Sequence, residues 1–185
     1  METKIIGTHN SMTYLKPRNW WMRAIEKYAK CQNRNLSEQL EVANCFDLRV
    51  FYKDGRWVFA HGLCEYTSKD IYEVLNELQK SSKTLYIRII LEKSDNMSDA
   101  FSRLCKRLEE LYPDFKFFGG NRKSDWAKLY TFKTDILDTD VHQFVSSMMG
   151  VSKLTTPKSY AKSHNQENYQ KAENGINLYD FLGDY

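Results

Sequence analysis

Residues 84–91 read TLYIRIIL, an almost wholly apolar run in which Arg88 is the one charged side chain. A β-strand that is buried on both faces has this composition, and such strands belong to parallel sheets that are covered by helices. Apolar residues at helical spacing precede the run in residues 68–78, with Ser68 as the expected cap, and follow it in residues 98–111. This alternation of helix, strand and helix predicts an α/β fold.

Further strands and helices are expected along the rest of the chain. The expected strands are residues 4–7, 43–52, 57–61 and 84–91, shorter candidates at 115–118, 129–133 and 145–149, and a last strand at 175–181. A helix is expected from Trp20 to about residue 41, with a break around 32–35 and Ser37 capping its second part, while residues 155–174 read as loop or helix. The Asp54-Gly55 pair between two of the strands is a strong hairpin signal.

Up to eight strands permit a (β/α)₈ barrel, which normally needs roughly 200 residues or more. The chain has 185 residues, so we expect a small, distorted TIM-type barrel in which some helices are missing or shortened. Three prolines and eight glycines provide few breaks, and a single domain over residues 1–185 is expected.

Composition excludes several classes of protein. The aromatic content of 14% is too high for a disordered chain, and no window approaches the ~18 uncharged apolar residues of a membrane span. The net charge of +3 arises from 27 basic and 24 acidic residues, a balance that does not indicate nucleic-acid binding. A substrate that carries phosphate is compatible with this charge.

Residues 1–4 run into a short apolar stretch without the apolar core of a signal peptide. We therefore expect a cytoplasmic protein, or a secreted one if a leader has been removed. Four scattered cysteines without a C-x-x-C pair are expected to be reduced thiols rather than a disulfide framework or a zinc site. A monomer is expected.

Polar side chains stand at or near the ends of the expected strands. They are His9, Asp47, Arg49, His61, Glu92 and Asp180. In a parallel α/β barrel the carboxyl ends of the strands share one rim, where active sites are built. Two imidazoles and an arginine on one rim suit phosphodiester cleavage: one imidazole can accept a proton from the nucleophile, the other can protonate the leaving oxygen, and the guanidinium binds the phosphate.

A structural role is the alternative for each of these residues. His9 could be a hydrogen-bonded turn residue, and Arg49 could form ion pairs with Asp47 or Glu92. Asp180 could be a loop-end carboxylate, since Asp184 lies close to it in the sequence. His142 and His164 lie in polar surroundings and are read as surface residues.

Several motifs resemble the catalytic X domain of phosphatidylinositol-specific phospholipase C. Gly7-Thr8-His9-Asn10-Ser11 resembles the opening motif, which usually reads G-T-H-D-S in bacterial members. The similarity continues in order along the chain, at residues 39–40 and 46–50, in Ala60-His61-Gly62, and at residues 89–92 and 176–181. It is dense over residues 4–93 and thin over residues 113–174.

The resemblance implies a lipid-metabolism enzyme, a phosphoric diester hydrolase or lyase, that cleaves phosphatidylinositol to diacylglycerol and a cyclic inositol phosphate. It implies His9 as general base, with Asp180 fixing its tautomer, Arg49 as the phosphate ligand and His61 as general acid. Asn10 belongs to the same catalytic motif but replaces its usual aspartate. The resemblance also places Asp47, Glu92 and Lys93 on the substrate-binding side.

Asn10 instead resembles the calcium-dependent eukaryotic enzymes, in which asparagine is a metal ligand. Asn10, Asp47 and Glu92 could supply three oxygen ligands to calcium, which takes six to eight. Arg49 stands where those enzymes carry an acidic ligand, and a fixed cation repels a metal. We therefore expect no metal, with calcium as the alternative.

Two other functions stay open at this stage. One is a glycerophosphodiesterase-type or sphingomyelinase D-type hydrolase of the same fold. The other is a non-catalytic module that binds a phosphoinositide or a sugar phosphate, because a fold does not guarantee an activity. The expected partner is an inositol phospholipid or related phosphodiester, and not nucleic acid. Transient contact with a membrane surface through Trp20 and Trp21 is the alternative to one of the two packing in the core.

Overall fold

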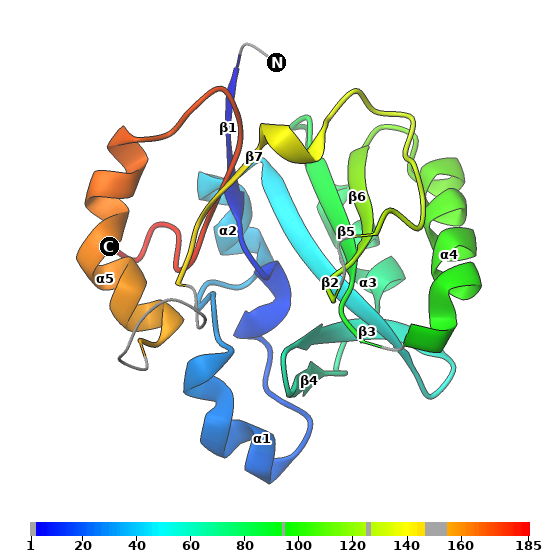
Figure 1. Cartoon of the computed structure of the whole chain (residues 1–185), viewed down its shortest axis with the longest axis horizontal. Coiled ribbons are helices and arrows are strands. Elements are labelled where there is room, and N and C mark those ends of the chain that lie inside the picture. The colour runs from blue at the N-terminus through cyan, green and yellow to red at the C-terminus, as the bar shows by residue number, and fades with distance from the viewer. Residues whose placement is uncertain (1–2, 94, 125–126, 147–154) are drawn as a thin grey trace.

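The computed structural model describes residues 3–93, 95–124, 127–146 and 155–185. In these residues the chain is a mixed α/β fold with one eight-stranded sheet and five α-helices (Figure 1). Six strands are parallel and curl into a half-barrel in the order β6–β5–β2–β1–β8–β7. Their bounds are β1 Lys4–Thr8, β2 Cys45–Lys53, β5 Tyr86–Leu91, β6 Lys116–Arg122, β7 Val141–Phe144 and β8 Gly175–Tyr179. The α/β prediction is confirmed, and closure into a TIM barrel is not confirmed by this part of the chain.

The remaining strands, β3 (Arg56–His61) and β4 (Cys64–Tyr66), extend the sheet as an antiparallel hairpin. The expectation that β3 is one of the parallel barrel strands is therefore wrong. Asp54 and Gly55 both have positive φ, at 49° and 80°, and form the tight turn that sends β3 back along β2.

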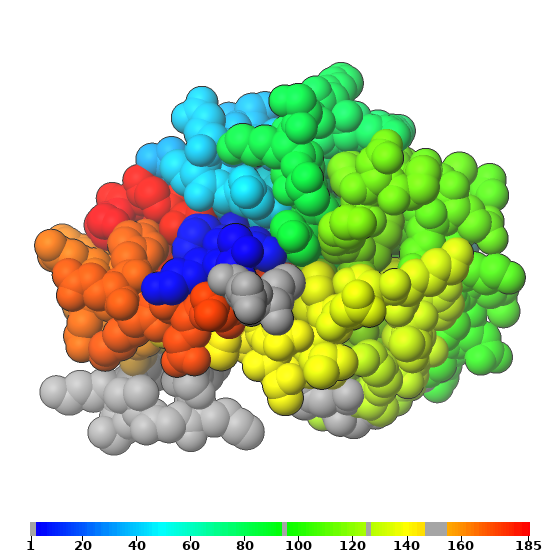
Figure 2. Space-filling model, turned by 90° about the horizontal axis from the view of Figure 1, so that it is seen from above, coloured from blue at the N-terminus to red at the C-terminus, as the bar shows by residue number. Residues whose placement is uncertain are grey.

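The helices surround the half-barrel (Figure 1). They are α1 Trp20–Ile25, α2 Leu36–Val42, α3 Ile71–Leu78, α4 Ser98–Leu111 and α5 Pro157–Gln170, with short 3₁₀ helices at Ser11–Tyr14, Glu26–Tyr28, Asp95–Met97 and Asp138–Asp140. In Figure 1 the chain begins at the end of the half-barrel opposite to α1. Figure 2 views that end, and the blue N-terminal residues lie near its centre between the orange and yellow segments.

Two helix starts differ from the sequence prediction. The cap of α2 is Asn35 rather than Ser37, because the Asn35 side chain accepts a hydrogen bond from Glu38 N while the Glu38 carboxylate accepts one from Asn35 N. The same reciprocal capping box puts Asp70, rather than Ser68, at the start of α3. The α-helix that begins at Trp20 ends at Ile25 and continues only as a 3₁₀ helix over Glu26–Tyr28, and the Ala29 carbonyl accepts a hydrogen bond from His61 instead of from a helical N–H.

Two of the short strand candidates are also misplaced. Residues 129–133 form no strand: Leu129 N and Tyr130 N both donate to the Gly120 carbonyl, and Phe132 stacks on Phe117. The strand expected at 145–149 lies earlier, as β7, and residues 147–149 are outside the described part of the chain. The stretch 155–174 was expected to be either loop or helix, and residues 157–170 of it form helix α5.

Side-chain alternation along the sheet separates a core from a polar concave face. Phe46, Leu48 and Val50 of β2 belong to the main core cluster, which also contains the apolar side chains of α3 and α4. The intervening Asp47 and Arg49 face the other side. Cys45, which lies on the same face nearer the start of β2, belongs to a separate apolar layer inside the half-barrel.

Candidate active site

A gap along one edge of β2 creates the site. On that edge β1 pairs only with the first residues of β2, up to Thr8 opposite Phe46, and β3 pairs only from Val50 onward. Residues 47–49 lie between the end of one neighbour and the end of the other. Asp47 and Arg49, two residues apart, project from the same face of the sheet beside this gap.

His9 and Asp180 are brought together by strand register. In the parallel pair β1–β8, Thr8 lies opposite Tyr179, so the residues that follow the two strands are neighbours. His9 Nδ1 is 2.8 Å from Asp180 Oδ1, and both side chains are buried. Gln32 holds the backbone of these two strand ends together, because its Nε2 donates to the carbonyls of both His9 and Tyr179 at 2.9 Å.

Asn10 turns the chain away from β1 in a left-handed conformation, with φ at 46°. Asparagine is one of the few residues that adopt this conformation readily. Its backbone N–H donates to Asp47 Oδ2 at 3.1 Å, and its side-chain nitrogen is 3.0 Å from His9 Nε2. Asn10 thus ties β1 to β2 and also contacts the imidazole.

The contacts of His9 define its tautomer. Arg49 Nη2 is 2.8 Å from His9 Nε2. A guanidinium can only donate, so Nε2 must hold a lone pair and the ring proton must be on Nδ1, where it is donated to Asp180. His9 therefore has the tautomer of a general base, with Nε2 as the basic atom and Arg49 as its present partner.

Arg49 is held by carboxylates on two sides. Its Nε donates to Asp47 at 3.1 Å, and its Nη1 is 3.7 Å from Glu92 Oε2. Burial lowers the pKa of Arg49, but Asp47 and Glu92 outweigh it and leave the pKa above its ordinary value. Burial likewise raises the pKa of Asp47, while Arg49 and Arg88 pull it well below the usual range. Both groups are therefore charged at any working pH.

His61, at the end of β3, faces His9 across the site. The two ring centroids are 5.9 Å apart and the rings are nearly perpendicular, at 84°. His61 Nδ1 donates to the Ala29 carbonyl at 2.6 Å, which leaves Nε2 for other partners. Burial, followed by the positive charge of Arg49, lowers the pKa of His61 to about 3, so the ring is neutral in the free protein.

Both histidines open onto a cavity of about 580 Å³. Its polar side includes Cys31, Asp180 and Lys123, and its apolar side is formed by Ile25, Tyr28, Ala29, Leu63 and Pro157. Burial and the neighbouring Asp180 raise the pKa of the Cys31 thiol well above its ordinary value. The cavity thus places an acid–base pair beside an apolar wall.

Glu92 supports the site, and Lys93 lies outside it. Glu92 Oε1 accepts hydrogen bonds from Gly62 N and Lys123 Nζ, while its second oxygen faces Arg49. The Lys93 ammonium instead pairs with Glu65 at 3.3 Å and lies over the Phe51 ring. The lysine of the cavity is Lys123, which sequence reasoning missed together with Cys31.

The oxygen set of the calcium alternative does not fit that ion. The Arg49 guanidinium lies between Asp47 and Glu92 and pairs with both, and Arg88 Nη1 lies 3.7 Å from the other Asp47 oxygen. A calcium ion would need to displace a buried cation before it could bind these carboxylates.

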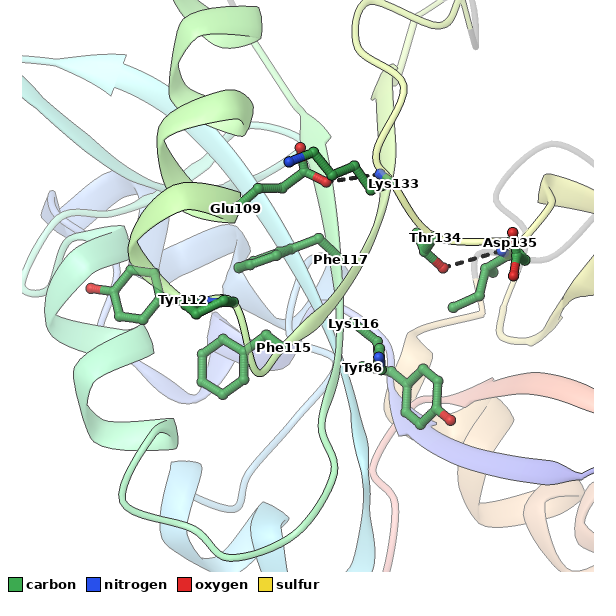
Figure 3. A pocket seen from close by; sticks show the side chains of 11 residues that line it. Tyr86, Glu109, Tyr112, Phe115, Lys116, Phe117, Lys133, Thr134 and Asp135 are labelled. Atoms are coloured by element: carbon green, nitrogen blue, oxygen red, sulfur yellow. Dashed lines mark hydrogen bonds between the residues drawn. The ribbon is translucent and has the colours of Figure 1, made fainter.

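A second cavity, of about 630 Å³, lies at the opposite end of the strands, where β5 and β6 begin (Figure 3). Its Glu109 carboxylate already accepts hydrogen bonds from Lys133 N at 2.8 Å and from the Tyr130 hydroxyl at 2.7 Å. Its aromatic residues pack on one another, as Phe115 does on Tyr112. None of the expected site residues is among the described residues that line it.

The remaining candidates lie on the surface. His142 is partly exposed and near the Asn174 carbonyl, and His164 is exposed and stacks on Tyr160. Trp20 and Trp21 are 80% and 42% exposed, so the expectation that one of them packs in the core is wrong; Met22 takes that place.

Comparison of the chain with known protein families, curated proteins and solved structures finds no match. No helix in the described residues is long and apolar enough to cross a membrane.

Proposed function

We propose that the protein is a phosphodiesterase of the phosphatidylinositol-specific phospholipase C type. The observation that carries the proposal is that His9, whose Nε2 contacts Arg49, and His61 line one cavity with their rings 5.9 Å apart. A base, a phosphate ligand and a potential acid are the three groups that an acid–base cleavage of a phosphodiester requires. The half-barrel is proposed to be a reduced (β/α)₈ barrel of that family.

In the first step the substrate phosphate takes the Arg49 donor that His9 holds in the free protein. His9 Nε2 is then free to remove the proton from a neighbouring hydroxyl, the inositol 2-hydroxyl in phosphatidylinositol. The oxygen attacks phosphorus, and Arg49 offsets the charge that grows on the phosphoryl oxygens. Asp180 stabilises the imidazolium that forms at His9, because it already accepts the Nδ1 proton.

In the second step His61 protonates the leaving diacylglycerol oxygen. The free-protein pKa of about 3 leaves His61 without that proton, and the positive charge of Arg49 is among its causes. A bound phosphodiester brings a negative charge that opposes this effect and raises the pKa. The product is a cyclic inositol phosphate, which water opens slowly when the two histidines exchange roles.

The apolar wall of the cavity suits an amphipathic substrate. Leu63 lines the cavity and is 67% exposed, and α1 presents Trp20 and Trp21 to solvent before it reaches cavity residue Ile25. Tryptophan and apolar side chains at the mouth of a site favour transient contact with a lipid surface. We propose that such contact brings the substrate to the cavity, and that the enzyme works without a metal because Arg49 supplies the cation.

A second candidate is a binding module for a phosphoinositide or a sugar phosphate. The neutral state of His61 and the engagement of His9 Nε2 by Arg49 favour it, because neither group is in its reactive state in the free protein. A glycerophosphodiesterase-type hydrolase is a weaker alternative, since carboxylates that would hold its magnesium are already paired with Arg49.

The test is turnover of phosphatidylinositol in mixed micelles, with EDTA and with added calcium. Wild type is compared with His9→Ala and His61→Ala, and His164→Ala serves as the control because its ring is exposed on α5. Turnover in EDTA that is lost in both site variants and kept in the control supports the metal-free mechanism. Binding of an inositol phosphate without turnover supports the binding module, and turnover only with calcium contradicts the role of Arg49.

A further inference from the structure

Three buried side chains of different chemistry converge at the back of the cavity. His9, Cys31 and Asp180 each offer one ligand atom, and these atoms lie within 4.8 Å of one another. All three also line the cavity. Cys31 belongs to none of the motifs that carry the resemblance to phospholipases.

The position of Cys31 is fixed by the backbone on both sides. Cys31 N donates to Thr13 Oγ1 at 2.9 Å, and the Cys31 carbonyl accepts a hydrogen bond from Phe181 N at 2.6 Å. The second bond ties the backbone of Cys31 to Phe181, the residue directly after Asp180. The cysteine and the aspartate therefore share one rigid corner of the fold.

The donor set indicates a particular class of metal. A thiolate, an imidazole nitrogen and a carboxylate together favour zinc or cobalt over calcium or magnesium. Asp180 Oδ2 is buried and receives no nitrogen or oxygen donor among the described residues. The corner thus holds an acceptor atom that the protein itself leaves without such a donor.

We propose that His9, Cys31 and Asp180 form a zinc site that switches off the reaction proposed above. The regulatory part rests on the proposed function, whereas the metal site does not. Three protein ligands and one water from the cavity complete the tetrahedral set that zinc prefers. The ion takes the place of the proton that His9 Nδ1 now shares with Asp180.

The protons balance as follows. The Cys31 thiol releases its proton to solvent when the sulfur binds zinc. His9 loses the proton from Nδ1, the atom that binds zinc. The imidazole ring stays neutral because it then carries a proton on Nε2. An N–H at Nε2 then faces the Arg49 Nη2 donor, now 2.8 Å away, so Arg49 must turn aside. Zinc therefore removes the basic atom and displaces the phosphate ligand together.

The experiment titrates the full chain, freed of metal with a chelator, with Co²⁺ in a thiol-free reductant. Wild type should develop an ultraviolet thiolate-to-cobalt charge-transfer absorption and visible bands of tetrahedral cobalt, and Zn²⁺ should abolish both. Cys31→Ser should lose the thiolate band and at least about tenfold in zinc affinity, measured by competition with a chromogenic chelator. Cys105→Ser is the control, because Cys105 is buried in the main core cluster.

Absence of the thiolate band in wild type, or its persistence in Cys31→Ser, overturns the metal site. Inhibition is read as the ratio of rates with and without zinc within each variant. A tenfold or greater loss of rate in wild type that disappears in Cys31→Ser supports the switch, and equal inhibition of both variants overturns it. Failure of turnover without metal refutes the proposed function while the cobalt spectrum still decides the site.

Discussion

Asp180→Asn tests the assignment of His9 as general base with almost no change in shape. Asp180 Oδ1 accepts the Nδ1 proton of His9 at 2.8 Å and leaves Nε2 basic. An asparagine that presents its oxygen to Nδ1 keeps this tautomer but loses the charge that stabilises the imidazolium. A hydrogen bond to a charged group contributes about 1.5–3 kcal/mol, so this orientation lowers kcat roughly 10- to 100-fold.

The opposite orientation of the amide is more damaging. Its NH₂ group then points at Nδ1, which must become the acceptor, and the ring proton moves to Nε2. His9 can then no longer accept the substrate proton, and the loss approaches the roughly 10⁴-fold effect of a wrong tautomer in serine proteases. We therefore expect a fall in kcat of about 10- to 10⁴-fold, with the larger value when the proton is on Nε2.

The assay combines turnover on phosphatidylinositol micelles with ¹⁵N NMR of the His9 ring, which reports which nitrogen carries the proton. Asp184→Asn is the matched control, because its carboxylate pairs with Arg34 and Asn33 away from the imidazole. The control should keep its rate, since such surface pairs contribute about 1 kcal/mol or less to stability. A folded Asp180→Asn protein with less than about a threefold loss of kcat would refute the role of Asp180.

Further predictions concern Arg49, His61 and Gly7. Arg49→Lys should lower kcat at least about 100-fold, measured in the same assay, because a single ammonium cannot hold its carboxylate partners and a phosphate in the fixed fork of a guanidinium. The depressed pKa of His61 means that the unfolded chain binds a proton from about pH 6.5 downward, whereas the folded protein does so only near pH 3. Stability should therefore fall on acidification through this range, by at most roughly 1.4 kcal/mol per pH unit from this group, and urea unfolding at pH 7 and 5 should show a smaller fall for His61→Gln. Gly7→Ala should destabilise the protein by about 1–3 kcal/mol in urea unfolding, because the added Cβ would lie 2.7 Å from side-chain atoms of both Cys45 and Leu178.

Strand-end reasoning explains which site residues the sequence could predict. His9 and Asp180 follow two strands, and the register of β1 and β8 makes such residues neighbours whatever the rest of the fold does. Asp47 and Arg49 were predictable for a related reason, since alternation along one strand puts both on the same face. The prediction that His61 joins them also agrees with the geometry, although β3 arrives from the opposite direction.

The errors come from features that depend on strand order. The Asp54-Gly55 turn indicated a hairpin, but the expectation of a small, distorted (β/α)₈ barrel counted β3 among its parallel strands. The resemblance places Lys93 on the substrate-binding side, whereas the lysine beside Glu92 is Lys123: β6 pairs with β5, and the residue after Arg122 lies beside the residue after Leu91. The rule that joins His9 to Asp180 would have found Lys123 had the β5–β6 pairing been known.

Cys31 shows a different limit. It lies in a loop between a 3₁₀ helix and α2, and no periodicity or motif distinguishes it from the other three buried cysteines. Its place depends on Thr13 and on Phe181, which are far from each other in the sequence. Only the assembled fold brings this thiol to the imidazole of His9.

The charges of the site explain why it is at rest without a ligand. Three carboxylates, of Asp47, Glu92 and Asp180, stand against three cations, Arg49, Arg88 and Lys123, so the site has no excess of either sign. A phosphodiester adds a negative charge that these charged residues do not neutralise. His61 lies nearby and can balance that charge by binding a proton. Under the proposed function the ligand therefore does two things at once: it draws Arg49 away from His9 and it charges His61. The free protein then contains neither the free base nor the acid, and binding of the substrate creates both.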